Sequence, residues 1–220
     1  MNKITVNLIR HGQTSYNVLG KIQGSSDIKL TQEGINQAYD CKIDNLDYDI
    51  AFSSSLIRAR ETLKIITGNL SKTPKIEVND MIIERGYGKF EGLTEEDIFE
   101  KYPEMYKKWK YDENTLIEDA ETIDNVIDRI KQFLNLIVKN KFKNVLVVTH
   151  SGVLFALYKF ITKSNLGDRP SNIKFPNCCS NNLNVYYENN LIKCLELNIG
   201  QHTYKYSCSP TEAIISTTSS

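Results

Sequence analysis

The stretch "KITVNLIRHGQTSYN", residues 3–17, joins a run typical of a buried β-strand to a short polar motif. The apolar and β-branched residues of 3–9 predict the strand. Arg10, His11 and Gly12 follow it directly. The whole chain holds 3 histidines, so the place of this one, beside an arginine at a strand end, needs a chemical reason.

Working outward from this stretch, the chain alternates between strand and helix patterns. Strands are predicted at 3–9, 48–54, 75–79 and 144–150, with a hairpin at 181–198 that turns at Asn189-Asn190. Helices are predicted at 30–43, 56–69, 93–112 (broken before Pro103), 120–140 and 152–162. This alternation predicts an α/β fold of three layers: a mainly parallel sheet with helices on both faces.

The chain contains no internal repeat and no linker-like segment. We therefore predict a single domain over residues 1–206, in which 86–122 form a small helical cap inserted into the α/β unit. The tail 207–220 is rich in Ser and Thr, which predicts a flexible end.

Charge and apolar patterning restrict the classes of partner. Lys plus Arg and Asp plus Glu both number 27, so no overall basic field favours nucleic acid or an anionic membrane. No apolar run could span a bilayer, and "ITVNLI" is too short for a signal peptide. We expect a cytoplasmic protein, as monomer or homodimer.

The 5 cysteines are irregularly spaced and form no CxxC pair, which favours reduced thiols. Cys178-Cys179 could be a metal or redox site. We interpret the pair as small residues in a loop before a strand.

Two histidines and two arginines are predicted to meet at one edge of the sheet. Ligands of open α/β sheets bind beyond the carboxyl ends of the strands. Arg10 and His11 end the first strand. His150 ends the strand 144–149, and Arg58 follows the second strand on the first turn of its helix.

These residue types suit phosphoryl transfer. Guanidinium groups bind phosphate or carboxylate with two parallel hydrogen bonds, and neutral imidazole is a competent nucleophile. A metal ion would lie beside two cationic guanidiniums, and no HxH or HExxH motif is present. We predict no metal site and a phosphohistidine intermediate.

Four segments, in chain order, resemble the histidine phosphatase superfamily, which includes the cofactor-dependent phosphoglycerate mutases. They are "LIRHGQTSYN" (8–17), "SSSLIRARETL" (53–63), "IERGYGKFEGLT" (83–94) and "VVTHSGVL" (147–154). An isolated RHG tripeptide would be a weak signal. Four segments on the expected elements, spread over nearly the whole chain, are a strong one.

The resemblance implies a role for each core residue. His11 attacks phosphorus in line and becomes phosphohistidine. Arg10, Arg58 and His150 hold the equatorial oxygens during transfer. Glu84 donates a proton to the leaving oxygen and later acts as the base for water. Hydrolysis of this kind needs no metal or organic cofactor.

The resemblance also suggests substrate contacts at less distinctive positions. Asn17 and Gln23 match polar positions that contact phosphate or substrate in relatives, although both could equally be loop hydrogen-bonders. Ser151, next to His150, joins the expected substrate-binding set. The roles of Arg85, beside the acid, and of His202 stay open, with His202 interpreted as structural.

The interval between Gly92 and His150 is short compared with that of the mutases, which indicates the phosphatase branch. In place of the G-G-E-S pattern frequent in the family, the chain has Asp-Ala-Glu-Thr at 119–122, which changes the fine substrate contacts. Four aromatic residues in the interval could line a pocket, but we expect them to pack the cap: Tyr102, Tyr106, Trp109 and Tyr111.

We therefore expect a metal-independent phosphomonoesterase that acts on small phosphorylated metabolites. The alternatives are a 2,3-bisphosphoglycerate-dependent phosphoglycerate mutase and an inactive phosphate-binding scaffold.

Overall fold

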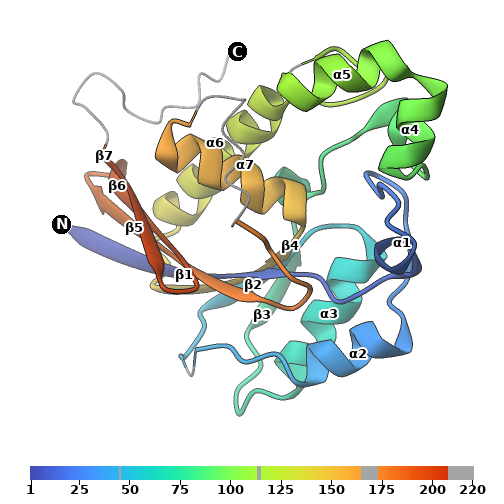
Figure 1. Cartoon of the computed structure of the whole chain (residues 1–220). Helices are drawn as coiled ribbons and strands as arrows, with labels where there is room; N and C mark the ends of the chain where they lie inside the picture. The colour runs from blue at the N-terminus through green and yellow to red at the C-terminus, as the bar shows by residue number, and fades with distance from the viewer. Residues whose placement is uncertain (45, 113–114, 165–172, 208–220) are drawn as a thin grey trace.

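A seven-stranded mixed sheet runs through the molecule in the order β3-β2-β4-β1-β5-β6-β7 (Figure 1). The computed structural model describes residues 1–44, 46–112, 115–164 and 173–207. The strands are β1 (Asn2–Arg10), β2 (Ile50–Ser53), β3 (Lys75–Val78), β4 (Asn144–Thr149), β5 (Ser180–Glu188), β6 (Leu191–Ile199) and β7 (His202–Ser207).

Seven α-helices and two 3-10 turns connect the strands within the described residues. The helices are α1 (Ser15–Val18), α2 (Gln32–Tyr39), α3 (Ile57–Gly68), α4 (Glu95–Lys101), α5 (Pro103–Tyr111), α6 (Ile123–Lys139) and α7 (Ser151–Thr162). The 3-10 turns are η1 (Asp80–Ile82) and η2 (Gly88–Phe90).

The expected parallel sheet is present in β3, β2, β4 and β1, which are parallel neighbours. The other half of the sheet is antiparallel, from β1 through β5 and β6 to β7. The hairpin turns at Asn189 and Asn190, whose φ angles of 52° and 61° suit a two-residue hairpin turn. The sequence did not predict β7, because this edge strand has one buried residue, Tyr206.

Helices cover both faces of the sheet, as expected (Figure 1). Successive β4 residues point to opposite sides. Val147 joins the larger core under α6 and α7, and Val148 joins the smaller core under α3. Threonine side chains cap three of the predicted helices: Thr31 caps α2, Thr94 caps α4 and Thr122 caps α6.

Helices α4 and α5 lie in the segment that we expect to form a cap, and the segment has a small core of its own, made of Phe90, Ile98, Trp109 and Ile117. The predicted capping box at Thr94 starts α4, and Pro103 opens α5. The two ends of the segment 86–122 meet, because the Glu121 amide donates to the Gly86 carbonyl at 2.8 Å. The segment therefore leaves and rejoins the α/β unit at one place.

The division into one domain with a flexible tail stays a prediction, and residues 208–220 lie outside the described residues. No helix in the described part of the chain is long and apolar enough to cross a membrane.

Candidate active site

The carboxyl ends of β1 and β4 bring the two predicted histidines together. The parallel register pairs Arg10 with Thr149, and the His11 amide donates to the Thr149 carbonyl at 3.0 Å. The next residue on each strand is a histidine, so the rings of His11 and His150 lie with their centroids 5.1 Å apart. The two histidines expected at this edge of the sheet therefore lie side by side.

One ring nitrogen of His11 is hydrogen-bonded, and the other has no hydrogen-bond partner within the part of the chain that the structure describes. Its Nδ1 lies 2.7 Å from the Gly12 carbonyl oxygen, which can only accept, so Nδ1 carries the proton. Burial, followed by the charges of Arg58 and Arg10, holds the pKa of His11 well below its ordinary value. The ring is therefore neutral at pH 7, with the lone pair on Nε2.

His150 is buried to the same degree, but both of its ring nitrogens are engaged. Arg58 Nε donates to His150 Nδ1 at 3.3 Å. Because a guanidinium cannot accept, the imidazole proton lies on Nε2, which donates to Ser54 Oγ at 2.6 Å. Burial, followed by the nearby His11 and Arg58, also holds the pKa of His150 well below its ordinary value.

Arg58 is fully buried and fixed by three acceptors. Besides His150, it donates to the Ser26 carbonyl at 2.6 Å and to the Gly24 carbonyl at 2.8 Å. A guanidinium has five N–H groups, so two of them are not engaged by these three acceptors. Arg58 contacts Gly24 and His150 contacts His11, and both Gly24 and His11 line the cavity of the site.

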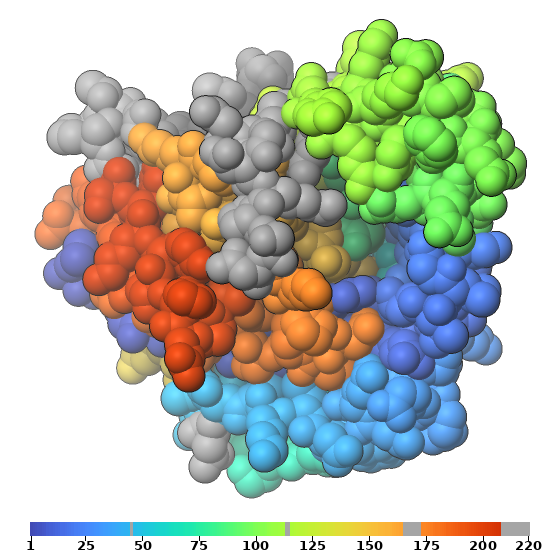
Figure 2. All heavy atoms as spheres, viewed as in Figure 1, coloured from blue at the N-terminus to red at the C-terminus, as the bar shows by residue number. Residues whose placement is uncertain are grey.

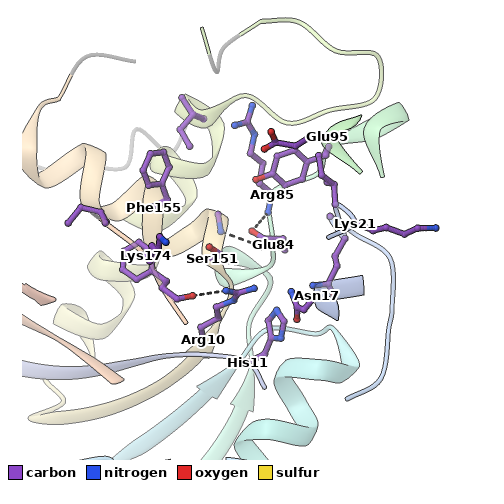
Figure 3. Close-up of a pocket in the computed structure, with 18 of the residues that line it drawn as sticks. Arg10, His11, Asn17, Lys21, Glu84, Arg85, Glu95, Ser151, Phe155 and Lys174 are labelled. Atoms are coloured by element: carbon purple, nitrogen blue, oxygen red, sulfur yellow. Dashed lines mark hydrogen bonds between the residues drawn. The ribbon is translucent and has the colours of Figure 1, made fainter. Parts of the chain in front are cut away.

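Arg10 reaches into the cavity from the end of β1 (Figure 3). One terminal nitrogen donates to the Phe175 carbonyl at 2.6 Å. Its buried Nε has no hydrogen-bond partner among the described residues. A buried donor of this kind is costly unless a ligand satisfies it, which fits an anion at this position.

Glu84 follows η1 and reaches the N-terminus of α7. Its carboxylate accepts from the Arg85 amide at 2.8 Å and from the Gly152 amide at 3.3 Å. Burial outweighs these hydrogen bonds and raises the pKa of Glu84 above its ordinary value. Gly152 lets the carboxyl approach so closely, because a Cβ at this position would meet Glu84 Oε1.

Asn17 and Gln23 are oriented by Thr14. The Thr14 amide donates to Asn17 Oδ1 at 3.0 Å, and the Thr14 hydroxyl donates to Gln23 Oε1 at 2.8 Å. Since both carboxamide oxygens are occupied, the NH2 groups are left as donors, and both residues line the cavity. The geometry therefore gives each residue a structural contact and also a place at the cavity.

These side chains border a cavity of about 810 Å³. In Figure 2, the green residues of α4 and α5 overhang a recess bounded by blue and orange residues. Figure 3 shows Arg10, His11, Asn17, Glu84 and Ser151 gathered in one part of it. The rest of the wall is mainly apolar or basic, from Lys21, Ile22, Arg85, Tyr87, Trp109, Lys110, Ile123, Phe155, Ile173, Lys174 and Phe175.

Residues 6–198 match a family model described as "Histidine phosphatase superfamily (branch 1)". The chain belongs to the histidine phosphatase superfamily. It is a phosphatase of that superfamily, as the resemblance of the four segments predicted.

Two relatives and one solved structure illustrate the similarity. A metal-independent phosphoserine phosphatase of Arabidopsis thaliana is 35% identical over 164 residues, covering 72% of this chain and 68% of the relative. A 2,3-bisphosphoglycerate-dependent phosphoglycerate mutase of Cytophaga hutchinsonii is 32% identical over 162 residues, covering 71% and 76%. A mycobacterial glucosyl-3-phosphoglycerate phosphatase is 22% identical with a TM-score of 0.76, covering 89% and 98%, and shows the fold.

The structure of this histidine phosphatase also gives the positions of Arg85, His202 and the cap aromatics. Arg85 lines the cavity, and its Nε donates to the Glu121 carbonyl at 2.8 Å. His202 is exposed on β7, at the far edge of the sheet from β3, and its structural interpretation stays a prediction. Of the four cap aromatics, Trp109 both packs the cap core and lines the cavity.

Sequence reasoning missed the segment 175–178, which supports the site from behind. Phe175 accepts from Arg10, and Asn177 Nδ2 donates to the His11 carbonyl at 2.9 Å. No motif marks these residues. Their place follows from the antiparallel pairing of β5 with β1, which brings the chain before β5 to the end of β1.

Proposed function

We propose that this chain is a metal-independent phosphomonoesterase, which hydrolyses small phosphorylated metabolites through a phosphohistidine on His11. One observation supports it above all others. A neutral histidine with a free Nε2 and a carboxyl group with a raised pKa line the same cavity. These are the nucleophile and the proton donor that a covalent phosphatase needs.

In the first step, His11 Nε2 attacks phosphorus, and the N–P bond forms as the P–O bond to the leaving group breaks. Glu84 gives its proton to the leaving oxygen, so an alcohol departs. Arg10 supplies its buried Nε–H, and Arg58 its two unused N–H groups, to the equatorial oxygens. His150 keeps Arg58 in place through the 3.3 Å contact and shares the charge that develops.

In the second step, a water molecule attacks the phosphohistidine. Glu84, now a carboxylate, takes the proton of that water, the N–P bond breaks, and phosphate and neutral His11 are regenerated. Glu84 returns to its protonated form, which its burial favours. The NH2 groups of Asn17 and Gln23 and the hydroxyl of Ser151 are positioned to contact the phosphate or its ester oxygen.

The mutase is the second candidate, because relatives of similar identity carry that name. Two observations favour hydrolysis. The interval from Gly92 to His150 is short, and a cavity of about 810 Å³ is in the upper range for sites that bury drug-sized ligands. A site of this size leaves room for water beside a three-carbon acid. It would therefore retain poorly the small acid to which a mutase returns the phosphoryl group.

The test is hydrolysis of p-nitrophenyl phosphate in EDTA by the full chain, with His11→Ala as the matched variant. The proposal predicts turnover that EDTA does not affect and that His11→Ala abolishes. Fast interconversion of 3- and 2-phosphoglycerate without ester hydrolysis would favour the mutase. Phosphate binding with no turnover of any ester would favour the scaffold. A screen of phosphorylated metabolites then identifies the substrate.

A further inference from the structure

Two cysteines from distant parts of the chain meet beneath the active site. Cys41 follows α2, and Cys178 precedes β5; in Figure 2, the orange residues before β5 lie against light-blue residues. Cys41 Sγ donates to the Cys178 carbonyl at 3.2 Å, so the Cys41 thiol lies directly against the backbone of Cys178. Both residues are free thiols and only partly buried, so small oxidants can reach them.

The segment that carries Cys178 is bonded directly to the site. The Cys178 amide donates to the Arg10 carbonyl at 2.9 Å. Asn177 Nδ2 donates to the carbonyl of His11 at 2.9 Å and to Asn17 Oδ1 at 3.3 Å. The Phe175 carbonyl accepts from the Arg10 guanidinium. A movement of Cys178 is therefore transmitted to the proposed nucleophile and to a phosphate-binding arginine.

We propose that Cys41 and Cys178 are a peroxide-sensitive thiol pair, whose disulfide switches the phosphatase off. The loss of phosphatase activity that we expect rests on the proposed function. The disulfide itself can be observed independently of activity.

The chemistry needs one hydroperoxide. The Cys41 thiolate attacks an oxygen of the peroxide, so an S–O bond forms, the O–O bond breaks, and the released hydroxide is protonated to water. The Cys178 sulfur then attacks the sulfenic sulfur of Cys41. The S–S bond forms, the S–O bond breaks, and the Cys178 proton leaves with the oxygen as a second water. Two thiols are oxidised while one peroxide is reduced.

The two thiols have different roles in this sequence. The neighbouring Cys178 lowers the pKa of Cys41, whereas the neighbouring Cys41 and burial raise the pKa of Cys178. Thiolate is the form that attacks peroxide. Cys41 is therefore the thiol that is oxidised first, and Cys178 is the resolving thiol.

Cys179 is a poorer partner for either thiol. Its Sγ accepts from Asn181 Nδ2 at 3.4 Å. A disulfide with its neighbour Cys178 would join Cα atoms about 3.8 Å apart, which is below the roughly 4.4–6.8 Å that disulfides span. The direct contact of Cys41 with Cys178 therefore favours this pair.

Closing the disulfide changes the site because the two sulfurs must come to about 2.0 Å from each other. The Cys41 donor to the Cys178 carbonyl is lost at the same time. Cys178 has a φ of 53°, in a tight turn that connects directly to Asn177. We expect this turn to shift toward Cys41 and away from Arg10 and His11. A displacement of about 1 Å in a catalytic group can cost on the order of 100-fold in rate.

The experiment treats the full chain with hydrogen peroxide, blocks free thiols with an alkylating reagent, and maps disulfides by peptide mass spectrometry. The kcat/KM for p-nitrophenyl phosphate is measured on the same samples before and after dithiothreitol. Cys41→Ser and Cys178→Ser are compared with Cys194→Ser, a matched control whose partly buried thiol lies on β6. Each variant is compared with its own reduced form.

We expect a Cys41–Cys178 peptide that forms as kcat/KM falls by on the order of 100-fold, with recovery in dithiothreitol. Cys41→Ser should keep its activity in peroxide, and Cys194→Ser should be inactivated like the unmodified chain. Absence of the cross-linked peptide, a disulfide without loss of rate, or equal inactivation of Cys41→Ser would each overturn the proposal. A reduced chain without any phosphatase activity would instead refute the proposed function, and the peptide map would still report whether the disulfide forms.

Discussion

The ends of β1 and β4 carry the same residue type in nearly the same environment, yet the two histidines differ in what they can do. Both rings are buried and neutral, and both pKa values are lowered mainly by burial. His11 keeps a free Nε2 at the cavity. His150 uses both nitrogens, one on Arg58 and one on Ser54.

This difference shows that burial and strand position make a histidine neutral, but hydrogen-bond partners decide its role. The Gly12 carbonyl fixes the His11 tautomer and leaves a lone pair toward the ligand. Arg58 and Ser54 occupy the lone pair and the proton of His150. His11 can therefore attack phosphorus, whereas His150 can hold the arginine that we expect to bind phosphate.

The largest effect should separate the two histidines by rate. Since His11→Ala removes the nucleophile, we expect kcat/KM to fall on the order of 10⁴-fold or more. His150→Gln removes one contact to Arg58 and should cost about 10²–10³-fold. Steady-state hydrolysis of p-nitrophenyl phosphate by both variants is the measurement. A His150→Gln variant as inactive as His11→Ala would contradict this difference in the roles of the two histidines.

A smaller and substrate-dependent effect should follow from Glu84→Gln. A general acid contributes about 10²–10⁴-fold, and its contribution falls when the leaving group needs no proton. We expect a large loss with an alkyl phosphate and a small one with p-nitrophenyl phosphate. Equal losses with both esters would contradict the proton-donor role.

The same pair of groups sets the pH profile. Activity needs neutral His11 and protonated Glu84, so kcat/KM should rise through the pKa of His11 and fall above that of Glu84. Because the pKa of His11 is lowered, the acid limb should lie below pH ~6.5. The alkaline limb should disappear in Glu84→Gln. An acid limb above this value, with chemistry shown to be limiting, would contradict the assignment.

The smallest effect concerns stability, where the two histidines should behave alike. A lowered folded-state pKa means that the unfolded chain binds more protons, so stability present above pH ~6.5 is lost as the pH falls. Each buried histidine adds up to about 1.4 kcal/mol per pH unit to this slope. Urea unfolding between pH 7 and 5 should show a shallower slope in His11→Gln and in His150→Gln. Replacing the exposed His202 by Gln should leave this pH slope unchanged. A change in slope as large as that of the two buried-histidine variants would argue against burial as the cause of the pH dependence.

Much of the fold follows from local patterns. The run at 145–148 is apolar throughout because β4 is covered on both faces, and the 120–140 pattern gave α6 within a few residues. The edge strand β7 and the single turn α1 were missed, since neither buries an apolar face. The antiparallel half of the sheet contains β7 as a third strand, which the predicted hairpin did not indicate.

The site was predictable where sheet topology determines it. Parallel strands must end at one edge, so Arg10, His11 and His150 could be placed together from sequence. Glu84 was identified by the family resemblance and not by periodicity, because it lies in an irregular segment after η1. The contact of Arg10 with Phe175 links residues 165 positions apart, and no local signal encodes it.

The central claim is that His11, and not His150, carries the phosphoryl group. The most direct measurement is acid-free rapid quenching with a phosphorylated substrate, followed by mapping of the modified peptide. The account predicts an acid-labile, base-stable phosphate on the His11 peptide, which is absent in His11→Ala and still formed in His150→Gln. Phosphate on the His150 peptide, or no phosphoenzyme during active turnover, would contradict it.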